Sequence, residues 1–358
     1  MSRFHPLQVT GIRRETRDSV VVTLKPREQD TSKFFFIQGQ YLTFRRHFDG
    51  QELRRSYSIC SGVDETLLKV GVKRVDGGAF STWINEELQT GDIIETMPPM
   101  GNFFSPIERS KTKFYLGFAG GSGITPVLSI IKTVLMHEKN AQFTLFYANR
   151  NVSSIMFREE LADLKNQYMD RFSVVHILES EQQEVDFFFG LIDASKMKRL
   201  FETLIEPSAV DMAFICGPEP MMLTIADGLR RHGLSEDKIK FELFSSSQQG
   251  KAKSPIKAKR VNGREVICEV SLTIDGLTRS FKMPKAGDHI LDVALTQKIE
   301  VPYACKAGVC STCRAKLIEG EVEMESNHAL EDYEVRAGYV LSCQCLPLTD
   351  KVSLTYDE

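Results

Sequence analysis

The sequence predicts a multidomain chain with three folded parts, and three observations carry this prediction. At 358 residues the chain is long enough for two or three domains, each with its own core. Residues 1–107 show short strand patterns typical of a small antiparallel β-barrel, residues 108–247 alternate strands with helices, and residues 264–358 combine strands with a cysteine motif. Residues 248–263 form a linker, because they contain basic residues but no acidic or aromatic ones. Its basic residues are Lys251, Lys253, Lys257, Lys259 and Arg260.

The first hundred residues are predicted to be β structure. Turn-forming residues separate short strand patterns at intervals that indicate a small barrel, with strands at 7–13, 20–25, 41–44 and 67–72. The string Arg55-Ser56-Tyr57-Ser58 lies in this region, and Gly78-Ala79-Phe80-Ser81 follows it. An arginine can bind a pyrophosphate, an aromatic ring can stack on a flavin, and a hydroxyl can hydrogen-bond near the reactive flavin nitrogen. Taken singly, each residue is also typical of an ordinary half-buried strand.

The middle part contains a candidate nucleotide site. An apolar strand pattern at 113–119 runs into Gly120-Gly121-Ser122-Gly123, and Thr125-Pro126 open a helical pattern. Glycines let backbone amides approach a pyrophosphate, Thr125 can cap the helix, and Pro126 fits its first turn. A glycine-rich turn alone is weak evidence, because this one lacks the G-x-G-x-x-G spacing.

Two further predicted strands strengthen the nucleotide site. They lie at 143–148 and 212–215, and the second runs into Cys216-Gly217-Pro218. Alternating strands and helices predict a doubly wound parallel sheet, which binds ligands at the carboxyl ends of its strands. Arg150 and Arg158 follow the first of these strands, where a nicotinamide coenzyme places its adenosine ribose. A 2′-phosphate favours cations there and a 2′-hydroxyl favours an acid, so the sequence favours NADPH over NADH.

The C-terminal part carries a cysteine motif. Cys305, Cys310 and Cys313 are spaced C-x4-C-x2-C, and Cys343 follows after a long gap. This is the plant-type ligand spacing for a 2Fe–2S cluster. A structural zinc site is the alternative, although zinc ribbons favour paired C-x2-C knuckles. Cys345 could also supply the fourth thiolate, because alternate residues of a strand point to the same face.

Composition limits the location and the partners. Eight cysteines, half of them in one motif, do not make a disulfide framework, and no signal peptide precedes Phe4, so a reducing cytoplasm is expected. A net charge of −3 gives no bias toward nucleic acid or a membrane. The apolar run at 114–136 contains several glycines and a proline, which predict a strand, a loop and a helix instead of a membrane span.

The C-terminal part resembles a β-grasp ferredoxin. A hairpin is predicted at 266–283 and a helix at 288–298, ahead of the cysteine loop. The segments Tyr303–Cys313 and Leu341-Ser342-Cys343-Gln344 resemble the two cluster segments of plant-type ferredoxins. This resemblance favours Cys343 over Cys345 as the fourth ligand.

Taken together and in order, the motifs of residues 5–245 resemble the ferredoxin–NADP reductase superfamily. With the ferredoxin-like part attached, the whole chain resembles the reductase component of a multicomponent oxygenase. That resemblance implies FAD, a 2Fe–2S cluster and NADPH as cofactors, and an oxygenase component as partner. The motifs are most similar to those of reductases that serve a multi-subunit di-iron epoxidase.

The resemblance also implies roles for single residues. For the flavin site these are Arg55 on the phosphate, Tyr57 stacked on the ring, Ser58 near the reactive nitrogen, and Gly78 and Ser81 continuing the phosphate site. For the coenzyme these are Gly121, Thr125, Arg150, Arg158, Cys216 and Gly217, the last two beside the nicotinamide. Ser58 and Cys216 are the residues expected at the reacting atoms. For the cluster these are Cys305, Cys310, Cys313 and Cys343.

Electron counting gives the expected reaction. Reduced nicotinamide gives up two electrons as a hydride and the cluster accepts one, so a flavin must act between them. Two alternatives remain within the enzyme class: a reductase for a ring-hydroxylating dioxygenase or one for a hybrid-cluster protein. From a different class, the chain could be a non-enzymatic iron–sulfur redox sensor whose nucleotide-like motifs are only structural turns.

Overall fold

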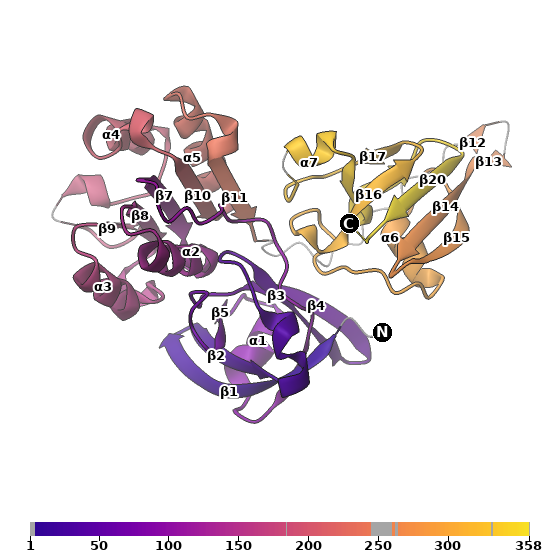
Figure 1. Cartoon of the computed structure of the whole chain (residues 1–358), viewed down its shortest axis with the longest axis horizontal. Coiled ribbons are helices and arrows are strands. Elements are labelled where there is room, and N and C mark those ends of the chain that lie inside the picture. The colour runs from indigo at the N-terminus through magenta and orange to yellow at the C-terminus, as the bar shows by residue number, and fades with distance from the viewer. Residues whose placement is uncertain (1–3, 184, 245–259, 262–263, 331, 358) are drawn as a thin grey trace. The chain divides into compact units, whose positions relative to one another are not determined.

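The computed structural model describes residues 4–183, 185–244, 260–261, 264–330 and 332–357. Contacts divide the chain into two compact units, Met1–Ser246 and Ser247–Glu358, drawn from indigo to orange and from orange to yellow in Figure 1. Most of the predicted linker lies outside the described residues, and the predicted domain boundaries stay predictions. No helix in the described part of the chain has the length and apolar character needed to cross a membrane.

The first sheet of unit 1 is an antiparallel barrel. Its strand order is β4-β3-β6-β1-β2-β5, and a bridge between Ile59 and Val70 joins the two ends. The strands predicted from sequence lie, to within a residue, in β1, β2, β3 and β5, whereas β4 and β6 had no predicted bounds. The strands are β1 (His5–Thr16), β2 (Ser19–Pro26), β3 (Tyr41–Phe48), β4 (Gln51–Ser58), β5 (Leu68–Lys73) and β6 (Ile93–Thr96).

The barrel has its own apolar core. Alternating residues of its strands point inward, so that Val22, Phe44 and Val70 pack with one another out of contact with solvent. Helix α1 (Ala79–Glu86) adds Phe80 and Trp83 to the same core. The helix is thereby fixed against the barrel, and its first turn is fixed with it.

The second sheet of unit 1 is parallel and doubly wound, as predicted. Its order is β11-β10-β7-β8-β9. The chain therefore adds β8 and β9 on one side of β7 and then places β10 and β11 on the other side. Ligands bind in such sheets where the order reverses, here at the carboxyl ends of β7 and β10. The strands are β7 (Phe114–Gly120), β8 (Gln142–Asn149), β9 (Phe172–Leu178), β10 (Met212–Gly217) and β11 (Ile239–Leu243).

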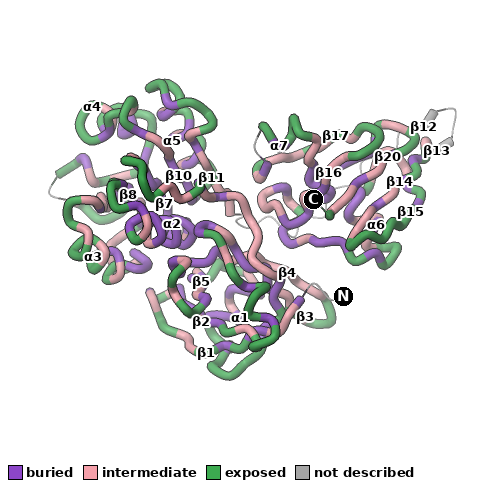
Figure 2. The backbone as a smooth tube through the Cα atoms, in the orientation of Figure 1, coloured by how far each residue is buried: buried purple, intermediate pink, exposed green. Residues whose placement is uncertain are grey.

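Helices cover both faces of this sheet (Figures 1 and 2). Residues of α2 (Ile124–His137) and α3 (Arg158–Gln167) share one core with it. Residues of α4 (Ala194–Thr203) and α5 (Glu219–Arg231) share a second core on the other face. Because both faces are covered, the strands are apolar on both sides, which explains the nearly continuous apolar runs in the sequence.

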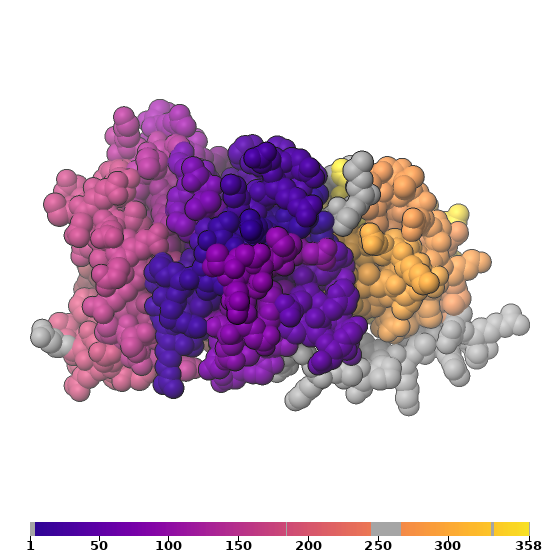
Figure 3. Space-filling model, turned by 90° about the horizontal axis from the view of Figure 1, so that it is seen from below, coloured from indigo at the N-terminus to yellow at the C-terminus, as the bar shows by residue number. Residues whose placement is uncertain are grey.

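The barrel and the α/β sheet pack directly on one another, and their side chains abut in Figure 3. The rings of Phe103 and Phe214 meet edge to face with centroids 5.5 Å apart. Gly71 of β5 allows a close approach, because a Cβ there would lie 2.7 Å from Thr125 Cγ2 and 3.0 Å from the Phe157 ring. Unit 1 is therefore one packed body built from two sheets.

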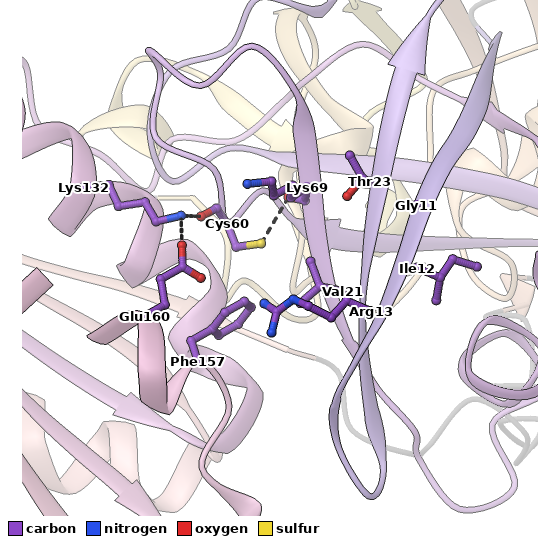
Figure 4. Close-up of a pocket in the computed structure, with 10 residues that line it drawn as sticks. All are labelled: Gly11, Ile12, Arg13, Val21, Thr23, Cys60, Lys69, Lys132, Phe157 and Glu160. Atoms are coloured by element: carbon purple, nitrogen blue, oxygen red, sulfur yellow. Dashed lines mark hydrogen bonds and ion pairs between the residues drawn. The ribbon is translucent and has the colours of Figure 1, made fainter. Parts of the chain in front are cut away.

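A pocket of about 260 Å³ lies at this boundary (Figure 4). Lys132, whose side chain is only 12% exposed, donates to the Cys60 carbonyl oxygen at 3.1 Å and pairs with Glu65 and Glu160. Lys69, which also lines the pocket, pairs with Glu65 as well. Both lysines are thus neutralised by carboxylates, and the ion pairs around the pocket hold the barrel and the α/β part of unit 1 together.

Unit 2 is built on a mixed five-stranded sheet in the order β15-β14-β20-β16-β18, with α6 packed on its core. The predicted hairpin is confirmed: Ile274 pairs with Leu277 around Asp275 and Gly276, both at positive φ as a tight primed turn requires. Its elements are β12 (Arg260–Val261), β13 (Arg264–Glu265), β14 (Ile267–Ile274), β15 (Leu277–Pro284), α6 (Ile290–Thr296), β16 (Arg314–Glu319), β17 (Val322–Met324), α7 (Asp332–Arg336), β18 (Tyr339–Leu341), β19 (Cys345–Pro347) and β20 (Lys351–Thr355).

Candidate active site and cluster site

The end of β4 carries the predicted flavin residues. Arg55 and Tyr57 alternate along the strand and so share a face, while Ser58 ends it and is buried. The Tyr57 ring is half-buried, with its centroid 5.5 Å from that of Phe44 and 6.2 Å from that of Phe80. Because Phe80 belongs to α1, these contacts place the end of β4 beside the first turn of that helix.

Gly78 and Ser81 build the turn that starts α1. Gly78 is the N-cap residue, and the Ser81 hydroxyl donates to the Gly78 carbonyl oxygen at 3.2 Å and accepts from the Val75 amide at 3.1 Å. The Ser81 hydroxyl is thus occupied within the turn. What the turn offers a phosphate is the first amides of the helix, which have no partner inside the helix.

The glycine-rich loop after β7 is open on one side and crowded on the other. Gly121 has φ +53°, and among the described residues no atom lies within 4 Å of where its Cβ would be. At Gly123 a Cβ would lie 2.2 Å from the Cys216 carbonyl oxygen. The Tyr147 hydroxyl donates to the Gly121 carbonyl oxygen at 3.0 Å and fixes the loop from below. The open side is a cradle in which backbone can approach a ligand closely.

The predicted capping role of Thr125 is wrong. The N-cap of α2 is Gly123, and Thr125 is the second residue of the helix. Its hydroxyl donates to the Ser122 carbonyl oxygen at 3.1 Å, and its methyl group packs against Gly71 in the barrel. Gly123 takes the cap because only a residue without Cβ fits beside the Cys216 carbonyl. Pro126 lies in the first turn, as predicted.

Three residues from distant parts of the chain meet where the two sheets join. Ser58 Oγ donates to Glu242 Oε2 at 3.1 Å, across 184 residues of sequence. Glu242 lies on β11 directly opposite Cys216 of β10 in the strand register. The structure therefore brings together the two residues predicted at the reacting atoms, and adds a carboxyl group to them.

Burial sets the charge state of this group. Desolvation raises the pKa of Glu242 to about 8, and the hydrogen bond from Ser58 opposes part of that rise. Burial also raises the pKa of the Cys216 thiol, and the nearby Glu242 adds to the rise. Both groups are thus mainly neutral near pH 7. The run Phe241–Phe244 resembles the segment by which the ferredoxin–NADP reductase superfamily closes the flavin pocket, but the sequence indicates no separate role for Glu242 within it.

The predicted coenzyme-phosphate residues lie on the exposed edge after β8. Arg150 and Arg158 are exposed, and neither has an ion-pair partner among the described residues. Asn149, immediately before Arg150, is buried with both side-chain amide atoms lacking a hydrogen-bond partner in the described part of the chain. The edge thus offers two free cations and one unsatisfied amide, the last of which no sequence pattern indicated.

The four predicted cluster cysteines converge in unit 2. The Cys305 thiol lies close enough to those of Cys310 and Cys343 for each to perturb its ionisation, and the Cys343 thiol is perturbed in the same way by Cys305 and Cys313. These contacts lower the pKa of Cys305 and raise the pKa of Cys343. Among the described residues no three His, Cys, Asp or Glu side chains are arranged around a single metal ion. These four cysteines, called the ring below, have the sequence spacing that is typical of a two-iron cluster.

Cys345 lies apart from this ring. Its Sγ donates to the Leu341 carbonyl oxygen at 3.2 Å, and burial raises the pKa of its thiol. The 3-10 turn Ser342–Gln344 precedes it, so Cys343 and Cys345 do not share a face as successive residues of one strand would. The arrangement favours Cys343 as the fourth ligand.

The residues present fit the expected cofactors. Gly121 leaves one side of the loop open to a ligand, and Gly123 lets the other side pack against the Cys216 carbonyl. The turn at Gly78 presents the first amides of α1, and four thiolates can ligate two irons. Together they define an oxidoreductase that brings a pyridine nucleotide, a flavin and an iron–sulfur cluster together in one chain.

Comparisons with known proteins agree with this class. Residues 6–104 match the family model of the oxidoreductase FAD-binding domain. Residues 118–227 match that of the oxidoreductase NAD-binding domain, and residues 272–348 match that of the 2Fe-2S iron-sulfur cluster binding domain. FAD, NAD and cluster domains therefore follow one another in the chain, and the chain is an NAD(P)H-dependent oxidoreductase.

Relatives match over the whole length. One of the subunits of 1,2-phenylacetyl-CoA epoxidase from Escherichia coli K12 is 40% identical over 100% of this chain and 99% of its own. The ferredoxin reductase component of 3-ketosteroid-9-alpha-monooxygenase from Rhodococcus rhodochrous is 33% identical over 99% and 97%. The solved structure of phthalate dioxygenase reductase matches with TM-score 0.59 and 26% identity over 98% of each chain. The chain belongs to the family of oxygenase reductase components that these relatives represent.

Proposed function

We propose that the chain takes electrons from NADPH and delivers them to an oxygenase of the phenylacetyl-CoA epoxidase type. The observation that carries this proposal is the meeting of Ser58, Glu242 and Cys216 where the barrel and the nucleotide sheet join. A redox sensor needs a cluster but no such junction between a flavin domain and a nucleotide domain. The converging thiols of unit 2 supply the outlet for electrons.

Bound FAD supplies a group that accepts two electrons as a hydride and releases them singly, as a one-electron cluster requires. Arg55 and the amides of the first α1 turn hold its phosphates, with Gly78 and Ser81 shaping that turn. Tyr57 would stack on its ring, and Ser58 would hydrogen-bond near its reactive nitrogen. Gly121, Gly217 and the backbone at Thr125 would hold the dinucleotide, and the cysteines of the ring would ligate the cluster.

The residues at the junction control protons and water. Below about pH 8 the Glu242 carboxyl holds its proton and adds no negative charge beside the flavin site. Ser58 is oriented by its hydrogen bond to Glu242, and the buried Cys216 keeps water from the nicotinamide side. This arrangement favours electron uptake without requiring a charged acid or base.

NADPH is preferred because of the free cations after β8. Arg150 and Arg158 are exposed with no ion-pair partner among the described residues, and Ser153 lies between them. A 2′-phosphate would receive charge-assisted hydrogen bonds there, whereas a 2′-hydroxyl would leave both cations unused.

The partner is an oxygenase component, and we infer a multi-subunit di-iron epoxidase. This inference is supported by the 40% identity to one of the phenylacetyl-CoA epoxidase subunits over nearly both whole chains. The relative from 3-ketosteroid-9-alpha-monooxygenase, 33% identical, makes a different oxygenase the main alternative.

Reconstitution tests the proposal. The purified chain should show flavin and cluster absorption, be bleached by NADPH under anaerobic conditions, and support turnover when mixed with the other phenylacetyl-CoA epoxidase subunits. Mixing it with the oxygenase component of the ketosteroid enzyme is the matched control, and should give little turnover. Faster turnover with the control would reassign the partner, and a purified protein without flavin absorption would make the chain a sensor.

A further inference from the structure

Gln344 follows the proposed fourth ligand, and its side chain reaches both cysteine segments. Its Nε2 has two N–H groups and three acceptors within reach: the Cys343 carbonyl oxygen at 2.8 Å, the Lys306 carbonyl oxygen at 3.2 Å and Cys343 Sγ at 3.6 Å, so one N–H is shared between a carbonyl oxygen and the sulfur. The residue is only 3% exposed. One buried amide therefore joins the loop of the first ligands to the segment of the last, across 38 residues.

Packing holds the Gln344 side chain in this position. Gly308 has φ +72°, and a Cβ there would lie 3.1 Å from Gln344 Cγ and 2.6 Å from the Ser326 carbonyl oxygen. The Gln344 carbonyl oxygen accepts from the Glu325 amide at 3.0 Å. The backbone of Gln344 is thus tied to the chain after β17, and its side chain lies against Gly308 of the ligand loop, where only a residue without a Cβ leaves room for it.

A donor beside a ligating sulfur affects the cluster's affinity for an electron. Reduction adds one negative charge that spreads onto the sulfurs, so a hydrogen bond to a sulfur stabilises the reduced form more than the oxidised form. The amide of Gln344 is neutral, so this stabilisation requires no buried charge. Ala307 also donates its backbone amide to Cys305 Sγ at 3.3 Å, but that donor persists whatever the side chain.

We propose that Gln344 is a positioning residue of the cluster site, which ties the last ligand segment to the ligand loop and raises the reduction potential of the cluster. The proposal rests on the proposed function, because it takes Cys343 as the fourth ligand. A raised potential makes the cluster a better acceptor for electrons from the flavin.

Gln344→Met in the full-length chain tests this. Methionine has a similar length and volume but has no N–H group. We expect the equilibrium constant for one-electron reduction of the cluster to fall by about tenfold, which corresponds to about 59 mV in a potentiometric titration of the cluster's EPR signal. The g-values should shift as well. An unchanged midpoint potential would overturn the proposal.

Gln344→Asn keeps the test decisive if the methionine variant does not hold a cluster. Asparagine retains the amide but is one methylene shorter, so it cannot bridge to Lys306. The cluster should assemble, and its potential should fall in the same direction by a smaller amount. A potential equal to that of the unmodified chain would contradict the proposal.

Cys345→Ala is the matched control. Cys345 is the next residue and is equally buried, but its thiol bonds the Leu341 carbonyl oxygen and not the ligand loop. The variant should keep the cluster and its potential. A shift as large as that of Gln344→Met would overturn the proposal for Gln344. Loss of the cluster in this control would instead show that Cys345 is the fourth ligand, which is a failure of the proposed ligand set.

Discussion

The two sites of the molecule are assembled in opposite ways. In unit 2 three of the four cysteines lie in one loop, Cys305–Cys313, and the fourth returns on a nearby segment. In unit 1 Ser58 and Glu242 are 184 residues apart and meet only because two sheets pack together. A site made by a loop is visible as spacing in the sequence, whereas a site made by packing becomes visible only in the fold.

The two kinds of site should also respond differently to substitution. A site made by a loop can be lost by one substitution while the rest of the chain stays folded. A site made by packing is coupled to the stability of its unit, so its substitutions should change both activity and stability.

Cys310→Ser should abolish the cluster and leave unit 1 intact. We expect reduction of cytochrome c or of the oxygenase partner to be lost, because a serine hydroxyl is a poor substitute for the thiolate. Reduction of ferricyanide by NADPH should be largely retained, because ferricyanide can take electrons directly from the flavin. Cys268→Ser is the control: Cys268 is buried in the same unit outside the ring, and its variant should keep the cluster. Loss of ferricyanide activity in a flavin-loaded Cys310→Ser protein would contradict a linear electron route.

Replacing either Arg150 or Arg158 by alanine should raise KM for NADPH by one to two orders of magnitude. Each contact with the 2′-phosphate is expected to contribute roughly 1.5–3 kcal/mol. KM for NADH should change little, because NADH carries no such phosphate, and this coenzyme serves as the control. Both arginines are exposed, so the melting temperature should not change. A preference of the unmodified chain for NADH would refute the assignment.

Gly123→Ala should weaken the packed site and its unit together. The added Cβ would lie 2.2 Å from the Cys216 carbonyl oxygen, which cannot move without distorting β10. We expect the free energy of unfolding of unit 1 to fall by about 1–3 kcal/mol, together with the rate of flavin reduction. Gly228→Ala is the control. Gly228 lies in α5, and its added Cβ would meet only the flexible side chain of Met197 from α4. Equal melting temperatures for Gly123→Ala and the unmodified chain would contradict the coupling.

Glu242→Gln should abolish the fall in the rate of flavin reduction at alkaline pH, which we expect to be severalfold in the unmodified chain. The folded pKa of about 8 lies above the ordinary value of 4.5, so the carboxyl is neutral below pH 8 and ionises above it. The new negative charge opposes electron uptake, so the rate in the unmodified chain should fall as the pH rises through about 8. The unfolded carboxyl ionises near 4.5, so the stability that the protonated Glu242 contributes is lost as the pH rises from about 4.5 to about 8 and changes little above that. The glutamine variant should lack both changes, and a pH profile that keeps its inflection would rule out Glu242 as its source.

Much of the fold could be predicted from the sequence, because local chemistry determines it. Alternating apolar residues gave the barrel strands, and the Asp275-Gly276 turn gave the hairpin. Strand β6 was missed, because its four residues are too few to show an alternation. The cluster ligands were visible as spacing, although their assignment stays a prediction.

The rest depends on contacts between distant segments. The N-cap of α2 is Gly123 and not the predicted Thr125, because only glycine fits beside the Cys216 carbonyl. That carbonyl belongs to a strand almost a hundred residues away in sequence. Glu242 lies in the short strand β11, and its raised pKa comes from burial that only the packed sheets create. Neither effect has a local signal.

Lys132 has a consequence for how such reductases can diversify. It belongs to α2, yet it is neutralised by Glu65 from the barrel side as well as by Glu160 from α3. A barrel recombined from another lineage without a carboxylate at position 65 would leave a largely buried ammonium with half of its counter-charge, at a cost of several kcal/mol. The flavin barrel and the nucleotide domain should therefore be exchanged only together. In gene fusions that preserve function, the junction should lie before residue 5 or after residue 244.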